Sequence, residues 1–169
     1  MAIIVIEGVD GSGKTTLLEC ACENQKERYF VSVCASRYPP NLKTAFQYLN
    51  WVKSQRDFDL LLDRIHFLSD RVYGPILRNE DLFKDLPITF GLQETACVVY
   101  ARPPDEVIIE NVGRQVHLKG VNENIEKLIK GYDDMMTALA LKNVKIFRYD
   151  YTIDEAIPFW RHVWGATKK

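Results

Sequence analysis

The chain has 169 residues, which is the length of one globular domain. Hydrophobic residues make up 47% of it and charged residues 27%, which excludes the disordered, collagen-like and coiled-coil classes. The 22 Lys and Arg residues nearly balance the 23 Asp and Glu residues, and this net charge of -1 argues against a nucleic-acid or anionic-membrane partner.

The apolar segments and the cysteines indicate where the protein resides. No basic region precedes the apolar stretch at residues 1–7, unlike in a secretory signal peptide. The longest apolar runs fall far short of the roughly 20 residues that a membrane span needs. The 4 cysteines form no CxxC pair, and we expect them to be buried thiols. The sequence therefore predicts a cytoplasmic protein.

Short runs of β-branched residues alternate with helical patterns along the chain, which is typical of βαβ units. We expect strands at residues 3–7, 29–34, 58–62, 97–100 and 145–148. We expect helices at residues 14–24, 42–54, 66–78, 105–112, 122–141 and 153–163. The first strand is an unbroken apolar run, so we place it mid-sheet with helices on both faces. The predicted fold is a three-layer α/β domain spanning residues 1–169, with a five-stranded parallel sheet and a ligand site at the carboxyl ends of its strands.

A glycine-rich segment, GVDGSGKT, follows the first predicted strand and opens a helix. It fits the phosphate-loop pattern G-x-x-x-x-G-K-[ST]. In such a loop backbone N–H groups cradle phosphate oxygens, while Lys14 reaches the β- and γ-phosphates and Thr15 coordinates Mg²⁺. The sequence therefore predicts binding of ATP with Mg²⁺, although GTPases, ATP-driven motors and small-molecule kinases all share this loop. The residues expected at the ATP phosphates are Gly8, Asp10, Gly11, Ser12, Gly13, Lys14, Thr15 and Thr16.

Charged residues also follow the second and third predicted strands. Arg37 comes after the second strand, where an arginine suits the dianion of a monophosphate and a carboxylate base would suit a nucleoside. Asp63 and Arg64 come directly after the third strand. There Asp63 can hold Mg²⁺ or orient the attacking oxygen, and Arg64 can bridge donor and acceptor phosphates. A solvated loop arginine and an exposed ion pair are the structural alternatives.

A basic segment bounded by glycines lies at residues 113–121, after the predicted helix 105–112. This pattern is typical of a lid that closes over the triphosphate and delivers a cation, here Arg114 or Lys119. An ordinary loop between two helices is the alternative. Trp51, with two aromatic residues before it, fits either stacking on a nucleobase or packing in the core.

Together these motifs resemble the thymidylate kinase family of P-loop nucleoside and nucleotide kinases. The segment EGVDGSGKTT is similar to that family's phosphate loop, whose internal aspartate, here Asp10, contacts the 3′-hydroxyl of the acceptor sugar. The segment RYP at residues 37–39 and the Asp-Arg pair with the residues after it resemble the family's acceptor site. The predicted substrate-binding residues are Asp10, Arg37, Tyr38, Trp51, Arg64, Ser69 and Tyr73.

Some features differ from the usual family pattern. Gly11 occupies the loop position that carries a cation in some members, so the resemblance implies that Arg114 or Lys119 supplies it. Arg102 stands where an acidic residue is usual. The chain is short between the second and third strands, which resembles compact bacteriophage-encoded members acting on modified pyrimidine or other deoxynucleoside monophosphates. A phage-encoded protein would work in the host cytoplasm, and the family's habit of dimerising implies a homodimer.

We therefore expect ATP-dependent phosphoryl transfer to a deoxynucleoside monophosphate, with dTMP as the first candidate. The expected metal is Mg²⁺, with Thr15 and Asp63 as its ligands. A deoxynucleoside kinase is one alternative, disfavoured by Arg37, and a regulatory P-loop NTPase without a nucleotide acceptor is the other. The predicted catalytic residues are Lys14, Asp63, Arg64, Arg114 and Lys119.

Overall fold

The structure, a computed structural model, describes most of the chain. The described residues are 2–24, 30–34, 59–90, 96–114 and 119–167, with Gln47, Asn50, Trp51, Ser54 and Leu92. Most of the predicted helix 42–54 lies outside them, and so do Arg37 and Tyr38.

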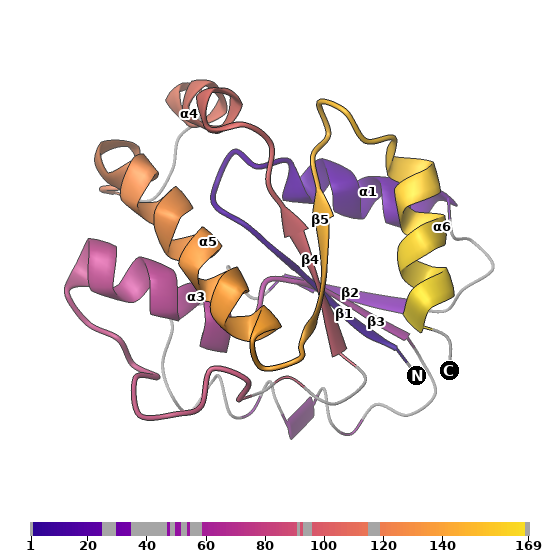
Figure 1. Ribbon diagram of the computed structural model, residues 1–169, viewed down its shortest axis with the longest axis horizontal. Helices are drawn as coiled ribbons and strands as arrows, with labels where there is room; N and C mark the ends of the chain where they lie inside the picture. Colours follow the sequence, from indigo (N-terminus) through magenta and orange to yellow (C-terminus); the bar gives the residue numbers. More distant parts are fainter. Residues whose placement is uncertain are drawn as a thin grey trace.

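Within the described part of the chain, parallel strands form a five-stranded sheet in the order β2-β3-β1-β4-β5 (Figure 1). Central strand β1 pairs with β3 from Ile3 opposite Leu60 and with β4 from Ile3 opposite Ala96. Each predicted strand is confirmed to within one residue at either end. The strands are β1 (Ile3–Glu7), β2 (Phe30–Cys34), β3 (Asp59–Asp63), β4 (Ala96–Ala101) and β5 (Lys145–Tyr149).

The described helices are α1 (Lys14–Asn24), α3 (His66–Tyr73), α4 (Asp105–Gly113), α5 (Ile125–Ala140) and α6 (Ala156–Thr167). The predicted helix 66–78 continues past α3 as a turn of π-helix, Gly74–Arg78. The predicted helix 122–141 begins with a 3-10 turn, Asn122–Asn124, and continues as α5.

Helix α6 begins three residues later than the predicted start at residue 153 and extends to Thr167. The residues before it form a turn around Asp150. The backbone N–H of Asp154 donates to the Asp150 carbonyl at 2.7 Å, and that of Thr152 donates to Asp150 Oδ1 at 3.0 Å. These bonds hold residues 150–154 in a turn, and the helix begins after it.

The alternating side chains of β1 pack on two different layers of helices. Ile3 and Val5 pack with residues of α3, α4 and α5, whereas Ile4 and Ile6 pack with residues of α1 and α6. Figure 1 shows these two groups of helices on opposite sides of the sheet. Burial on both faces confirms the central position expected from the unbroken apolar run. The Trp160 indole N–H joins the two helices of the second layer by donating to a backbone carbonyl of α1 at 3.0 Å.

The expectation of buried thiols is only partly correct. Cys97 on β4 is buried, but Cys20 is half-buried and Cys22 is exposed, and none of these three is in a disulfide. Helix α1 turns Leu17 and Ala21 toward the sheet. The residue after Ala21 therefore faces away from the core, because successive helical side chains point about 100° apart.

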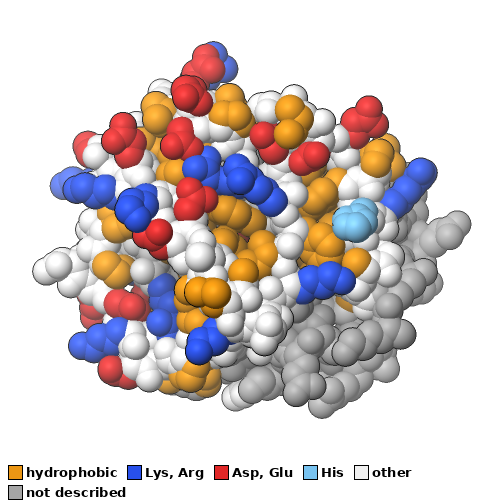
Figure 2. Space-filling view, viewed as in Figure 1, with side chains coloured by type: hydrophobic (Ala, Val, Ile, Leu, Met, Phe, Trp, Pro, Cys, Tyr) orange, Lys and Arg blue, Asp and Glu red, His pale blue; other side chains and the backbone are white. Residues whose placement is uncertain are grey.

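Acidic and basic side chains are interspersed over the face shown in Figure 2, in keeping with the near-zero net charge. Among the helices that the structure describes, none combines the length and the apolarity needed to cross a bilayer.

Candidate functional site

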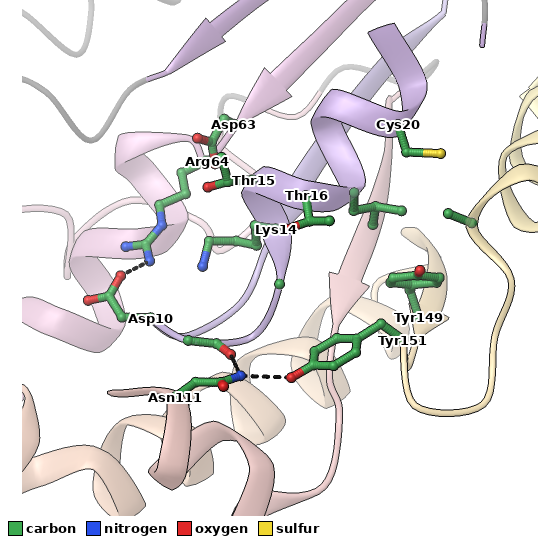
Figure 3. Close-up of a pocket in the computed structure, with 14 residues that line it drawn as sticks. Asp10, Lys14, Thr15, Thr16, Cys20, Asp63, Arg64, Asn111, Tyr149 and Tyr151 are labelled. Atoms are coloured by element: carbon green, nitrogen blue, oxygen red, sulfur yellow. Dashed lines mark hydrogen bonds and ion pairs between the residues drawn. The ribbon is translucent and has the colours of Figure 1, made fainter. Parts of the chain in front are cut away.

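A cleft of about 580 Å³ opens at the carboxyl ends of β1 and β3, the edge predicted to carry the ligand site (Figure 3). The phosphate loop and the start of α1 form its floor. The lining residues are Asp10, Gly11, Gly13, Lys14, Thr15, Thr16, Leu17, Cys20, Asp63, Arg64, Asn111, Tyr149, Tyr151 and Ala156.

The phosphate loop is closely covered, and two of its positions strongly favour glycine. Gly11 has φ 78°, and a Cβ there would lie 2.9 Å from Val112 Cγ2 on α4. Gly13 has φ 85°, and a Cβ there would lie 2.8 Å from the Tyr151 ring. Both values fall in the left-handed region that favours glycine. The Gly11 position therefore has no room for a cationic side chain.

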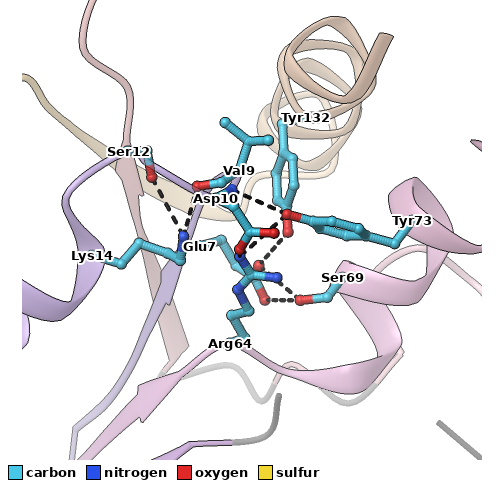
Figure 4. Close-up of polar contacts among 9 residues, drawn as sticks. All are labelled: Glu7, Val9, Asp10, Ser12, Lys14, Arg64, Ser69, Tyr73 and Tyr132. Carbon is cyan, nitrogen blue, oxygen red and sulfur yellow. Dashed lines mark hydrogen bonds and ion pairs between the residues drawn. The ribbon is translucent and has the colours of Figure 1, made fainter. Parts of the chain in front are cut away.

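Lys14 is buried with its ammonium folded onto the loop. Its Nζ donates to the Val9 carbonyl at 2.7 Å and lies 3.5 Å from Ser12 Oγ (Figure 4). Burial, aided by the nearby Arg64 guanidinium, lowers the pKa of Lys14 to about 7. A bound triphosphate would bring negative charge to this ammonium and raise the pKa again.

Arg64, directly after β3, is held beside the phosphate loop by contacts with Asp10 and Tyr73. Its Nη2 lies 2.5 Å from Asp10 Oδ1 and donates to the Tyr73 hydroxyl at 3.2 Å. The guanidinium carbon also lies 5.0 Å from the centre of the Tyr73 ring. The Tyr73 hydroxyl in turn accepts the Asp10 backbone N–H at 3.1 Å. These contacts hold a cation at the mouth of the cleft in a defined position.

Two oxygen donors in the cleft fit the predicted magnesium site. The Thr15 hydroxyl and the Asp63 carboxylate both line it (Figure 3). The described residues include no group of three or more His, Cys, Asp or Glu side chains that could hold a metal by themselves. Mg²⁺ is usually held by one or two protein oxygens and completes its shell with water and substrate phosphates. This donor pair therefore suits Mg²⁺ better than a metal that needs a full set of protein ligands.

Asn111 and Tyr151 cover the loop, and sequence reasoning missed both. Asn111 Nδ2 donates to the Gly11 carbonyl at 2.9 Å and to the Tyr151 hydroxyl at 2.7 Å (Figure 3). Tyr149 and Tyr151 give the cleft an aromatic wall beside Ala156. The tyrosines end or follow β5, so a search of the fifth strand end would have found them. Asn111 lies inside a helix and carries no local signal.

Glu7, the last residue of β1, lies fully buried beneath the loop and was also given no role from sequence. Burial raises the pKa of its carboxyl to about 7, although nearby Arg64 opposes the shift. The carboxyl accepts a hydrogen bond from the Ile65 backbone N–H. It also accepts hydrogen bonds from the Ser69 and Tyr132 hydroxyls (Figure 4). Ser69 and Tyr73, predicted to bind substrate, thus lie behind the lining of the cleft.

The two predicted lid cations do not line the cleft. Arg114 is exposed at the end of α4 and pairs with Glu110 on the same helix. Lys119 is exposed, and residues 115–118 between them lie outside the described residues. Trp51 is 37% exposed and is not part of the described lining. The remaining loop residues, Gly8 and Ser12, form the turn itself, with Ser12 fully buried.

Comparison with known proteins shows a shared fold. No family model and no curated protein matches the sequence. The YorR protein of Bacillus subtilis, solved in complex with phosphorylated GDP, has a TM-score of 0.71 at 15% identity, over 98% of this chain and 95% of that one. Deoxyadenosine kinase from M. mycoides with bound dATP has a TM-score of 0.61 at 16% identity, over 99% and 100% of the two chains. The same kinase with bound dCTP gives 0.62 at 17% identity, over 97% and 99%. The chain therefore has the α/β fold of P-loop kinases.

Proposed function

We propose that this protein transfers the γ-phosphoryl group of ATP to a deoxynucleoside monophosphate, with dTMP as the acceptor and dTDP and ADP as products. The observation that carries the proposal is the placement of two fixed cations, Lys14 and Arg64, on one cleft. Phosphoryl transfer between two phosphates needs positively charged groups beside both phosphates and little covalent assistance. Lys14 serves the triphosphate in this account, and Arg64 serves the acceptor phosphate.

The carboxylates of the described cleft lining favour a monophosphate over a nucleoside. A nucleoside hydroxyl needs a base to take its proton, whereas a phosphate acceptor is already an anion. Asp10 is ion-paired with Arg64, and Asp63 is the proposed partner of Thr15 at Mg²⁺. Neither is left for the role of base. Mg²⁺, when bound there, neutralises phosphate charge.

The aromatic half of the cleft offers a place for the base of the phosphoryl donor to bind. Tyr149 and Tyr151, with Ala156 beside them, form a wall next to the phosphate loop. Flat aromatic rings suit a nucleobase, since every base has a face that can stack. On this account the adenine lies there and the triphosphate runs along the loop, while residues 113–121 close as a lid from which Arg114 or Lys119 reaches the transferring group.

A deoxynucleoside kinase is the competing function, because deoxyadenosine kinase is among the proteins of similar fold. ADP formation from Mg·ATP, measured in parallel with dTMP, dUMP, dGMP, thymidine or no acceptor, separates the two. Stimulation by a monophosphate supports the proposal, and the strongest responder identifies the base. Stimulation by thymidine alone would assign a nucleoside kinase. Turnover that is indifferent to every acceptor would assign a regulatory NTPase.

A further inference from the structure

The Glu7 carboxyl joins three elements beneath the phosphate loop. From the end of β1, Oε1 accepts the Ile65 backbone N–H at 2.8 Å. Oε2 accepts hydrogen bonds from Ser69 Oγ on α3 at 3.1 Å and from the Tyr132 hydroxyl on α5 at 3.2 Å (Figure 4). The side chain is fully buried and is not part of the cleft lining. Any effect of this carboxyl on the site therefore passes through its neighbours.

The residue before Ile65, Arg64, has an unfavourable backbone conformation. Arg64 has φ 68°, a left-handed value that side chains other than glycine adopt at a cost. Two hydrogen bonds flank it: the Arg64 N–H donates to the Ile6 carbonyl at 2.9 Å, and the next N–H, that of Ile65, donates to Glu7. The first bond involves only the backbone and survives any substitution of a side chain. The second depends entirely on the carboxyl of Glu7.

We propose that Glu7 is the positioning residue that aims Arg64 at the acceptor phosphate, with Tyr132 and Ser69 orienting its carboxyl. The inference rests on the proposed function, in which Arg64 binds that phosphate. Without the Glu7 bond the turn after β3 relaxes toward an ordinary φ, and the guanidinium leaves its place beside Asp10. Because Tyr132 belongs to α5, the same carboxyl also links that helix to the turn that carries Arg64.

The test compares variants that keep or remove the acceptor of the Ile65 N–H. Glu7→Gln retains a carbonyl oxygen, whereas Glu7→Leu has a similar size and none. Glu7→Leu should raise the KM for dTMP at least about tenfold, because it leaves a buried N–H unpaired. The Kd for ATP should stay within about twofold of the wild-type value, since Lys14 and the loop are retained. Glu7→Gln should restore the KM to within about threefold of the wild-type value.

Two tyrosines provide a matched pair that avoids replacing a core carboxyl. Tyr132 and Tyr100 stack with ring centres 6.3 Å apart, but the Tyr132 hydroxyl bonds Glu7 and the Tyr100 hydroxyl bonds Asp133. Tyr132→Phe should raise the KM for dTMP about threefold, the effect of one lost hydrogen bond. Tyr100→Phe should leave it unchanged. If Glu7→Leu does not fold, this pair decides the question.

The outcomes separate this inference from the function it rests on. A wild-type protein that no monophosphate stimulates would overturn the proposed function and, with it, the role of Glu7. A wild-type kinase whose dTMP KM is unmoved by Glu7→Leu and by Tyr132→Phe would leave the function standing and overturn the inference. An equal loss of ATP affinity and dTMP affinity would also overturn it, because general damage to the loop would explain both.

Discussion

The Arg64 guanidinium and the Asp10 carboxylate form an ion pair of 2.5 Å between the end of β3 and the phosphate loop. A cation placed to receive the acceptor is thereby attached to the loop that receives the donor. Phosphoryl transfer requires the attacking oxygen to lie in line with the bond that breaks. A fixed link between the groups that bind the two phosphates restricts their relative positions and so favours that geometry.

Asp10→Asn is the substitution that tests this link. Loss of the ionised partner should release Arg64 and raise the KM for dTMP about tenfold, because an ion pair is replaced by a weaker hydrogen bond from the guanidinium to a neutral amide. The Kd for ATP, measured by calorimetry, should change little. Asp134→Asn is the control, since it removes the same charge from an exposed pair with Lys130 on α5. Unchanged dTMP kinetics in Asp10→Asn would show that the pair does not serve the acceptor.

Lys14→Ala removes the cation from inside the phosphate loop. We expect kcat to fall at least about a hundredfold, as when one preorganised donor to a transition-state anion is lost. Lys130→Ala removes an exposed lysine from α5 and should retain the wild-type rate. Steady-state ADP formation with saturating dTMP is the measurement. A Lys14→Ala enzyme with near-normal kcat would refute the assignment of the phosphate loop.

Gly11→Ala tests whether α4 closes over the loop as tightly as the structure indicates. The new Cβ would meet Val112 Cγ2 at 2.9 Å with φ at 78°, so the free energy of unfolding should fall by about 1–3 kcal/mol. Gly113→Ala is the matched control on α4, where a Cβ meets nothing within 4 Å. Urea unfolding of the two variants gives the comparison. Equal stability in both would mean that the helix does not press on Gly11.

Two buried groups, Glu7 beneath the phosphate loop and Lys14 within it, predict a minimum in the free energy of unfolding near neutral pH. Burial raises the pKa of Glu7 from 4.5 to about 7, so its contribution to folding is present below pH 4.5 and is lost as pH rises through about 7. Burial lowers the pKa of Lys14 from 10.5 to about 7, so its contribution is present above pH 10.5 and is lost as pH falls through about 7.

Urea unfolding between pH 5 and pH 9 separates the two limbs of this profile. Relative to the wild type, Glu7→Gln should remove the gain in stability on the acid side, and Lys14→Met should remove the gain on the alkaline side. Other titrating groups are common to all three proteins, so the differences between the curves isolate these two. If the free energy of unfolding of all three proteins changes with pH in the same way over the whole range, neither group has the shifted pKa that its burial predicts.

Local patterns predicted the sheet, α1 and the phosphate loop, because each depends on residues that are neighbours in sequence. The run Ile3–Glu7 followed by GVDGSGKT is one such unit. The contacts that complete the site join residues far apart: Asn111 lies 100 positions from Gly11, and Tyr132 lies 125 from Glu7. Such contacts follow from the packing of α4 and α5 on the sheet, and no local spacing encodes them.

Prediction was weakest where a side chain's direction decided its role. Ser69 follows the Asp-Arg pair at a spacing that suggested contact with substrate, but its hydroxyl turns inward to Glu7. Arg114 pairs with Glu110 and stays outside the cleft lining. The spacing of residues on a helix gives the face on which a side chain lies, and the choice of partner on that face depends on tertiary structure.

The most direct test of the central claim is to follow the γ-phosphoryl group of labelled ATP in the presence of Mg²⁺ and dTMP and to identify the product that carries it. The account predicts label in dTDP, formed in step with ADP by the wild-type protein and lost in Lys14→Ala. Label that appears only as inorganic phosphate, or that enters thymidine but not dTMP, would contradict it.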